Sequence, residues 1–430
     1  MYSRVRYKRE GMIQNILKWF RIIFKQAISS IAFIPAVVAL FFLLLSFFMI
    51  QFDFSDTGKV IKSNAHWLTL KDASTARSII SVITGGVISL TVFSFSMVMI
   101  ILNQTASQMS NRILDKLIGN RFQQTVLGFY IGTIVYALFL LSTIRDINSG
   151  IYVPAISTYM LIALTVVDIF LFIYFLHYVT QSAKYETIIH RIFDSTRKSL
   201  ENSCILKSSS NIHLDELEGL SVNEAEGLSV KASKSGIYQG FAHDGLLNFC
   251  KKENLVVYFL HPAGALVLEN TPLIFISNKK SLSEDLQMDL RSLINIHRGQ
   301  EIKANYYYGF RQLMEVAVKA LSPGINDPGT AVLSLQALGD LLAFRLQNYP
   351  VHQIRDEEGT VRIITKERSF AEIFEDCIYP IWDYGSEDRM VLKELLHVLP
   401  QLQTPYEQPL ISNLLKLVKK AILAKWPDSV

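Results

Sequence analysis

The stretch Ser78–Ser110, SIISVITGGVISLTVFSFSMVMIILNQTASQMS, decides the fold. It is long and apolar enough to cross a bilayer as one helix, although small and polar residues recur through it. At about 100° of rotation per residue, several of these residues fall within an arc of about 40°. We call this set the polar stripe, and it consists of Ser78, Gly85, Ser89, Ser96, Asn103 and Ser107. A lipid-exposed helix has no need of such a stripe, so we predict that this face lies against protein or water.

The composition of the whole chain agrees with a membrane protein. Half of the 430 residues are hydrophobic, the mean hydropathy is +0.27, and only 19% are charged, whereas a soluble protein usually has about 25%. The net charge of +4 is too small to indicate nucleic-acid binding, and no basic run with interleaved aromatic residues supports it. The three cysteines have no C-x-x-C spacing, so they predict neither a disulfide framework nor a zinc site.

Four apolar runs reach the length of about 20 residues that spans hydrocarbon. They are Ile28–Phe52, Ser78–Leu102, Thr125–Ile144 and Pro154–Thr180. Lys and Arg residues gather before the first run, between the second and third, and after the fourth, which predicts that both termini are cytoplasmic. The loop Asp53–Arg77 also carries four basic residues, so the contrast between the two sides is modest.

The predicted fold class is a membrane all-α bundle of four transmembrane helices followed by a cytoplasmic α+β domain. Residues 1–27 form a basic amphipathic segment that could lie on the inner leaflet, and residues 28–180 form the bundle. The fourth helix is expected to continue into a cytoplasmic helix and linker, residues 181–227. Residues 228–277 predict a small β-barrel or sandwich unit, and residues 278–430 a mostly helical domain with a hairpin near 352–366. The expected helices of that last domain include 284–296, 305–321, 328–347, 370–384, 387–401 and 408–425.

The string ALSPGINDPGTA, Ala320–Ala331, predicts a corner between two helices. Ser322 precedes Pro323, which ends the first helix, and Gly324 makes the turn. Asp327 then caps the second helix and Pro328 takes its first position, where a missing N–H costs nothing. Asn326 and Asp327 could also hold a cation or an oxyanion at the helix start, although the cap alone explains them.

This signature closely resembles that of a bacterial family of predicted membrane proteins known by a domain of unknown function, number 2254. The likeness extends to TVFSFSMVMIILNQTASQMSNRIL, YFLHYVTQS, PAGALVLENTPL and YGFRQLMEVAVKALSPGINDPGTA, and covers about Ile28 to the C-terminus. The chain departs from the family pattern at Asn111, where Pro is usual before Arg112, and at Ala265, where an acidic residue is usual. The resemblance implies a multi-pass protein of the bacterial inner (plasma) membrane with a cytoplasmic domain, and it supplies no activity.

Asp168 lies in the middle of the fourth run, where a charged carboxylate costs about 2.5–3.5 kcal/mol on insertion scales. It therefore indicates an ion or proton site, or a partner for a basic group, unless it is a neutral or water-bridged acid inside the bundle. His177 and Arg112 are predicted to lie at the membrane interface.

Patterns typical of enzymes are missing from the sequence. There is no G-x-S-x-G, H-E-x-x-H, Walker A or G-x-G-x-x-G motif, and the histidines lack the spacing of metal ligands. The hairpin HPAGALVLENTPL has no lysine at its tip, so it predicts no covalently attached cofactor. The tract Tyr306–Tyr308, followed by Gly309 and Arg311, could recognise a planar or anionic group or pack against the β unit. We therefore expect no enzyme, no cofactor and no metal.

Two classes of function remain open. One is a homo-oligomeric channel or permeation protein, which carries an inorganic ion across the lipid bilayer and is assembled or gated by its cytoplasmic domain. The other is a sensor or scaffold whose helices only tether that domain. The polar stripe and Asp168 favour the first class, because a tether needs neither.

Overall fold

The computed structural model describes residues 30, 32–64, 70, 72–108, 121–144, 153–182, 184–204, 227–403 and 408–426. The chain forms two compact units, one made of the helices before Ala183 and one made of the chain from Lys184 onward. We call them the helical unit and the C-terminal unit. The basic segment 1–27 lies outside the described residues.

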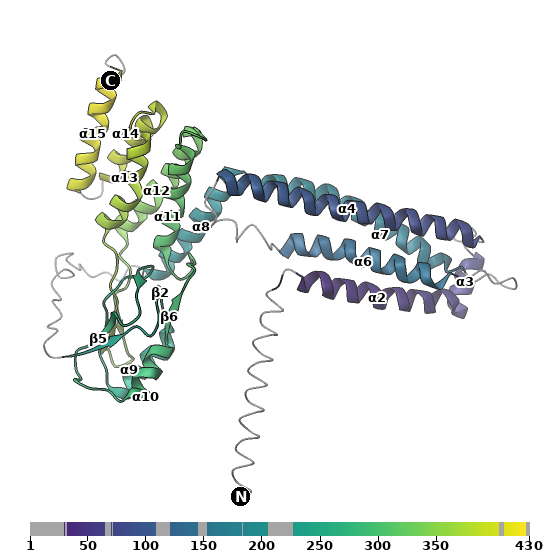
Figure 1. The fold of residues 1–430 in the computed structure, drawn as a ribbon, viewed down its shortest axis with the longest axis horizontal. Coiled ribbons are helices and arrows are strands. Elements are labelled where there is room, and N and C mark those ends of the chain that lie inside the picture. The colour runs from purple at the N-terminus through teal and green to yellow at the C-terminus, as the bar shows by residue number, and fades with distance from the viewer. Residues whose placement is uncertain are drawn as a thin grey trace, which may run out of the picture. The chain divides into compact units, whose positions relative to one another are not determined.

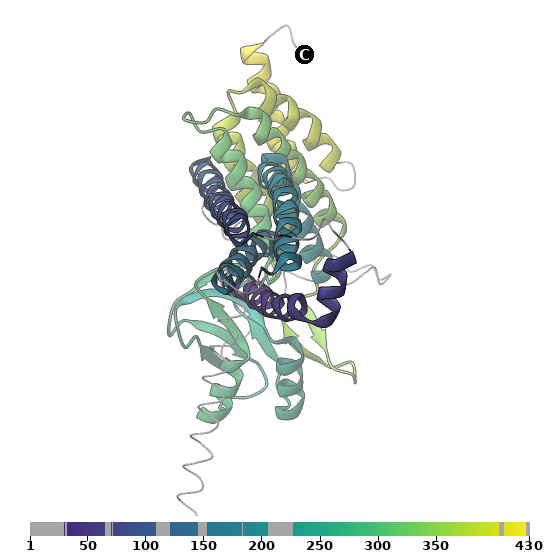
Figure 2. The same cartoon turned by 90° about the vertical axis from the view of Figure 1, so that its right-hand side faces the viewer.

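Four helices of the helical unit are long and apolar enough to cross a membrane, which confirms the predicted bundle. They are α2 (Phe33–Phe54), α4 (Ala73–Gln108), α6 (Arg121–Thr143) and α7 (Ala155–Ser182). Figure 1 shows them running alongside one another, and Figure 2 shows them nearly end-on. A short polar helix, α3 (Asp56–Asn64), follows α2 and was not expected from the sequence.

Helices α2 and α6 approach each other closely at two glycines. A Cβ atom at Gly128 would lie 3.2 Å from the Cα of Pro35, and one at Gly132 would lie 2.7 Å from the ring of Phe42. The two glycines form a G-x-x-x-G pattern, which lets transmembrane backbones pack tightly. Close packing inside the helical unit is therefore carried by α6 and not by the polar stripe of α4.

The C-terminal unit is an α+β region with two open sheets, which confirms the predicted α+β class of this part of the chain. Its first part contains α8 (Tyr185–Ser203), β1 (Leu228–Lys231), β2 (Gly236–Phe241), α9 (His243–Glu253), β3 (Val257–Phe259), β4 (Leu266–Val267) and β5 (Pro272–Ile276). Then come α10 (Glu284–Ser292), β6 (Ile294–His297), α11 (Tyr306–Ala320), α12 (Pro328–Gln347), β7 (Gln353–Arg355) and β8 (Val361–Ile364). The chain continues through α13 (Phe370–Gly385), α14 (Arg389–Gln403) and α15 (Pro409–Lys425).

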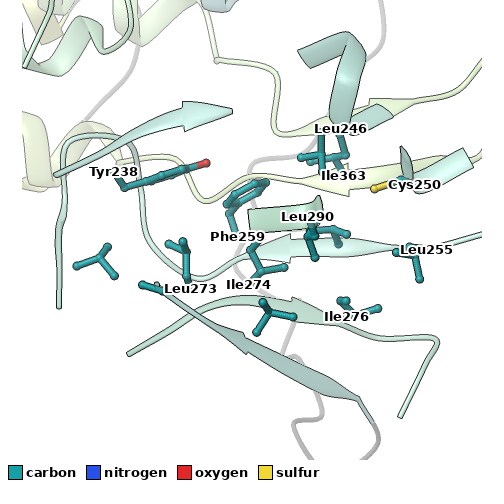
Figure 3. Packing of buried hydrophobic residues seen from close by; sticks show 14 of the residues in the cluster. Tyr238, Leu246, Cys250, Leu255, Phe259, Leu273, Ile274, Ile276, Leu290 and Ile363 are labelled. Atoms are coloured by element: carbon teal, nitrogen blue, oxygen red, sulfur yellow. The ribbon is translucent and has the colours of Figure 1, made fainter. Parts of the chain in front are cut away.

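One sheet has the strand order β1-β5-β3-β8-β7 and the other the order β4-β2-β6. All pairs are antiparallel except β3 and β8, where Val257 is paired with Ile363. Both sheets contribute to one hydrophobic core with α9 and α10, which Figure 3 shows around Phe259, Leu246 and Leu290. Tyr238 stacks on Phe259 with ring centroids 5.3 Å apart, so the two sheets meet through aromatic contacts.

Two local predictions differ from the structure. The helix expected over 284–296 ends at Ser292, and the chain then forms β6, because Ile294 and Ile296 alternate toward the core as a strand requires. The fourth transmembrane helix does not continue past Ser182, since Lys184 is extended and a separate helix, α8, begins at Tyr185.

Candidate functional site

The polar stripe lies on the outer side of α4. Ser78, Gly85, Ser89, Ser96 and Asn103 are all exposed, whereas the opposite side of the helix is buried at Ala76, Ile80, Thr84, Val87 and Ser94. Ser107 belongs to α4, but its side chain lies outside the described part. Within the described chain, no protein covers the stripe.

The surroundings of the stripe are apolar and open. Exposed Ile88, Val92 and Phe95 flank it, as side chains that face lipid would. A Cβ atom added at Gly85 would meet nothing within 4 Å, so this glycine serves no close contact inside the chain. The hydroxyl of Ser89 donates to the carbonyl of Gly85 at 2.9 Å, one turn earlier on the same helix. The stripe is thus a narrow line of small and polar groups on an apolar surface.

The interior of the helical unit holds a second polar group of residues, which we call the intramembrane polar cluster. It consists of Ser94 on α4, Tyr130 and Thr133 on α6, and Asp168 on α7. All four are buried; Asp168, Tyr130 and Thr133 are 0% exposed. The Thr133 hydroxyl lies beside the Asp168 carboxyl, and the Tyr130 hydroxyl lies beside that of Ser94 and within electrostatic range of Asp168.

None of the cluster's side-chain oxygens has a hydrogen-bond partner among the described residues. Apolar side chains pack around Tyr130, namely Val87, Val126, Phe175 and Val179. An unpaired carboxylate in such surroundings is costly, which makes the cluster the strongest candidate for a site in the helical unit.

A different acid, Asp53, ties the other end of the bundle together. It is fully buried at the end of α2 and accepts hydrogen bonds from the backbone N–H and the hydroxyl of Ser157 at 2.7 and 2.8 Å. Lys62 of α3 donates to its carboxylate at 2.9 Å. Asp53 therefore satisfies the free N–H groups at the start of α7, as a capping residue from a distant part of the chain. Sequence reasoning missed it, because Ser157, whose N–H it caps, lies about a hundred residues away.

The two residues predicted to be interfacial have separate outcomes. His177 is exposed in the last two turns of α7. Arg112 and the neighbouring departure from the family pattern, Asn111, lie outside the described residues.

The signature loop forms the predicted corner between α11 and α12. Asp327 accepts hydrogen bonds from the N–H of Thr330 at 3.2 Å and from its hydroxyl at 2.6 Å, which makes it the cap of α12. Asn326 has a φ of 50° and is exposed, as are Pro323 and Gly324. Hydrogen bonds local to the corner, including that of the Ser322 hydroxyl to the Lys319 carbonyl at 2.6 Å, account for its shape without a ligand.

The tyrosine tract is buried within the C-terminal unit. The hydroxyl of Tyr306 donates to Glu367 at 3.2 Å, that of Tyr307 donates to Asp376, and Arg368 lies 4.0 Å from the centre of the Tyr307 ring. Burial raises the pKa of Glu367 and of both tyrosines. The tract therefore packs inside the unit, which favours the structural alternative over ligand recognition.

A shallow groove of about 220 Å³ lies between α8 and α12. Ile189, Phe193 and Ala337 are among its apolar lining residues, and Glu186, His190 and Asp340 supply its polar edge. Sequence reasoning did not predict this groove. Within the described residues, no group of three or more His, Cys, Asp and Glu side chains is placed to hold a metal ion.

Comparisons with known proteins agree with the signature. Residues 28–401 match the family described as "Predicted membrane protein (DUF2254)". Similar curated proteins include "Uncharacterized protein MT1328" of Mycobacterium tuberculosis and "Uncharacterized protein Mb1321c" of Mycobacterium bovis. Each is 25% identical over 365 residues, which cover 82% of this chain and 69% of the relative. No solved structure matches the chain. The family match spans most of the sequence, and the chain therefore belongs to the DUF2254 family of predicted membrane proteins.

Proposed function

We propose that this protein is a homo-oligomeric ion channel or permeation protein of the bacterial inner membrane, and that the C-terminal unit assembles or gates it. The observation that supports the proposal is the outward position of the polar stripe. Gly85, Ser89, Ser96 and Asn103 lie on the exposed side of α4, and no other described helix covers them. In the oligomer, a second copy of the chain covers them.

Two arrangements of the copies use the stripe differently. In a pore, the hydroxyls of Ser89 and Ser96 face water near the middle of the membrane, and Asn103 lies at the cytoplasmic mouth. In a packed interface, the same small residues let two α4 helices approach closely. Packing within one chain is not an alternative for the stripe, because the buried side of α4 is the opposite one. The proposal commits to the pore, since ion permeation needs a polar path and the stripe runs along the exposed side of α4 from Ser78 to Asn103.

Thiol accessibility tests the pore directly. On a background without Cys204, Cys250 and Cys377, Ser89→Cys and Ser96→Cys should react with a charged, membrane-impermeant thiol reagent. Ile88→Cys, Val92→Cys and Phe95→Cys are matched controls, because they are exposed in one chain but lie beside the stripe, where a pore would turn them to lipid. The native cysteines should react little with the reagent, because all three thiols are buried. Burial also raises the pKa of Cys204 to about 11 and of Cys250 to about 12.

Ion flux into liposomes containing the purified protein completes the test. Flux that the thiol reagent blocks only in the stripe variants supports the pore. Absence of flux together with unreactive cysteines at positions 89 and 96 would overturn it. A purified protein that is monomeric in detergent would also contradict the pore and would favour the tethered sensor or scaffold.

A further inference from the structure

We propose that the intramembrane polar cluster is a binding site for a monovalent metal cation inside each protomer. Its ligands are the hydroxyls of Ser94, Tyr130 and Thr133 and the carboxylate of Asp168. The proposal rests on neither oligomerisation nor conduction, because the cluster and the polar stripe lie on opposite sides of α4: Ser94 is rotated by about 160° from Ser96 around the helix axis.

The chemistry of the cluster selects a hard cation. Every polar side-chain atom in it is an oxygen, and all of these oxygens are buried without a hydrogen-bond partner in the described chain. Oxygen donors of this kind suit alkali and alkaline-earth ions, whereas thiolate and imidazole ligands, which transition metals prefer, are not among them. A buried carboxylate that accepts no hydrogen bond from an N–H group is not compensated by the protein for its loss of hydration. A bound cation would compensate it.

The charge of the cluster selects a monovalent ion. Asp168 is its only carboxylic acid, and the three hydroxyls are neutral at neutral pH. One positive charge makes the site neutral, whereas a divalent ion would leave a net positive charge in a low-dielectric interior. Among the described residues of the three helices that form the cluster, no basic side chain lies nearby. The Lys and Arg residues of α4, α6 and α7 are Arg77 and Arg121, which lie 17 residues before Ser94 and 9 residues before Tyr130, or about 25 and 13 Å along the helix axes.

The position of the ligands favours a formed site. Tyr130 and Thr133 are three residues apart on α6 and therefore project from the same side of that helix. Asp168 of α7 lies beside Thr133 and Ser94 of α4 lies beside Tyr130, so three helices contribute to the cluster. The apolar packing around Tyr130 keeps bulk water away, which strengthens each ion–oxygen contact.

Thermal unfolding of the purified full-length protein in detergent tests the proposal. Unfolding is followed in sodium, potassium or lithium chloride against N-methylglucamine chloride, at constant ionic strength and pH. A ligand that binds only the folded protein raises its Tm with concentration, so at least one alkali salt should raise the Tm by ~2 °C or more in a saturable way.

Single-site variants show whether the response comes from the cluster. Asp168→Asn should abolish the shift. Thr133→Val and Tyr130→Phe each remove one oxygen and preserve the shape, and they should move the half-maximal cation concentration about tenfold higher or more. Ser96→Ala is the matched control, because it removes a hydroxyl from the same helix on the opposite side, and it should respond like the wild type.

Three results would overturn the proposal. The first is a Tm that is the same in all the salts. The second is a cation-dependent shift that survives unchanged in Thr133→Val and Tyr130→Phe, which remain decisive even if Asp168→Asn fails to fold. The third is a Tm that depends on pH through Asp168 but not on any alkali cation, which would mean that the acid is held protonated.

Discussion

At the scale of single residues, Asp53 and Asp168 are both fully buried in the helical unit, yet their surroundings differ. Asp53 receives a lysine, a backbone N–H and a hydroxyl, so its charge is compensated by protein. Asp168 receives no hydrogen bond within the described residues. A buried acid with a full set of partners is structural, whereas one without them requires a ligand or a proton. The two residues should therefore respond to substitution in different ways.

Asp53→Ala should destabilise the protein by roughly 2–5 kcal/mol. The substitution leaves the N–H and hydroxyl of Ser157 without an acceptor and Lys62 without its carboxylate. Chemical unfolding in detergent measures the change. Asp53→Asn keeps an acceptor for Ser157 and should cost less. If Asp53→Ala and Lys62→Met show no coupling in a double-mutant cycle, the ion pair contributes nothing to stability.

Asp327→Ala should lower the stability of the C-terminal unit by about 0.5–2 kcal/mol, because it removes the cap of α12. Pro328→Ala is the control on the same turn and should be milder, since that proline only preorganises φ. Thermal unfolding compares the two. An Asp327→Ala protein with unchanged stability and lost ion flux would show that the corner binds a ligand and that the capping account is insufficient.

His352 gives the C-terminal unit a dependence on pH. Burial lowers its pKa, so the folded protein favours the neutral imidazole over the cation. This contribution to stability is present above the unfolded pKa of about 6.5 and is lost as the pH falls through the folded pKa. The Tm of the wild type should therefore fall more than that of His352→Asn between about pH 7.5 and 5.5. Parallel curves for the two proteins would contradict the assignment.

At the scale of helices and strands, the contact between α8 and α11 depends on Gly309. A Cβ atom there would lie 2.7 Å from the Cβ of Thr196, whose side chain is fully buried. Gly309→Ala should therefore destabilise the unit by about 1–3 kcal/mol through overpacking. Thr196→Ala makes room and should restore part of the loss in the double variant, which unfolding measurements will show. Additive losses would mean that the two helices separate instead of clashing.

The sequence predicted most helices because their signals are local. Long apolar runs define the four spans, and Pro328 after Asp327 fixes the start of α12 where the structure has it. The G-x-x-x-G pattern of Gly128 and Gly132 was also visible, but its partner helix could not be read from it. Pairings between distant parts of the chain were not predicted, because no local sequence signal identifies the partner. Examples are the parallel pairing of β8 with β3 and the capping of α7 by Asp53. For the candidate site, the sequence identified Asp168 and the stripe, but not that Tyr130, Thr133 and Ser94 surround the acid.

At the scale of the whole molecule, the helical unit has two polar features with different demands. The stripe is exposed on the outer side of α4, whereas the intramembrane polar cluster is buried within one chain. A permeation protein can use both, with a path between subunits and a bound ion that stabilises each bundle. A tether needs neither feature, and for this reason the two tests proposed above separate the functions independently.

The orientation of the chain in the membrane decides which solution reaches each end of the stripe. We predict that both termini are cytoplasmic, because Lys and Arg residues flank the bundle on that side: seven precede the first span, and Arg112, Lys116 and Arg121 follow the second. Alkaline phosphatase fused after position 69 should be active, and the same reporter after position 207 should be inactive. A fluorescent protein that folds only in the cytoplasm should give the reverse pattern and controls for expression. Phosphatase activity at position 207 would place the C-terminal unit outside, and Asn103 would then lie at the outer mouth of the stripe.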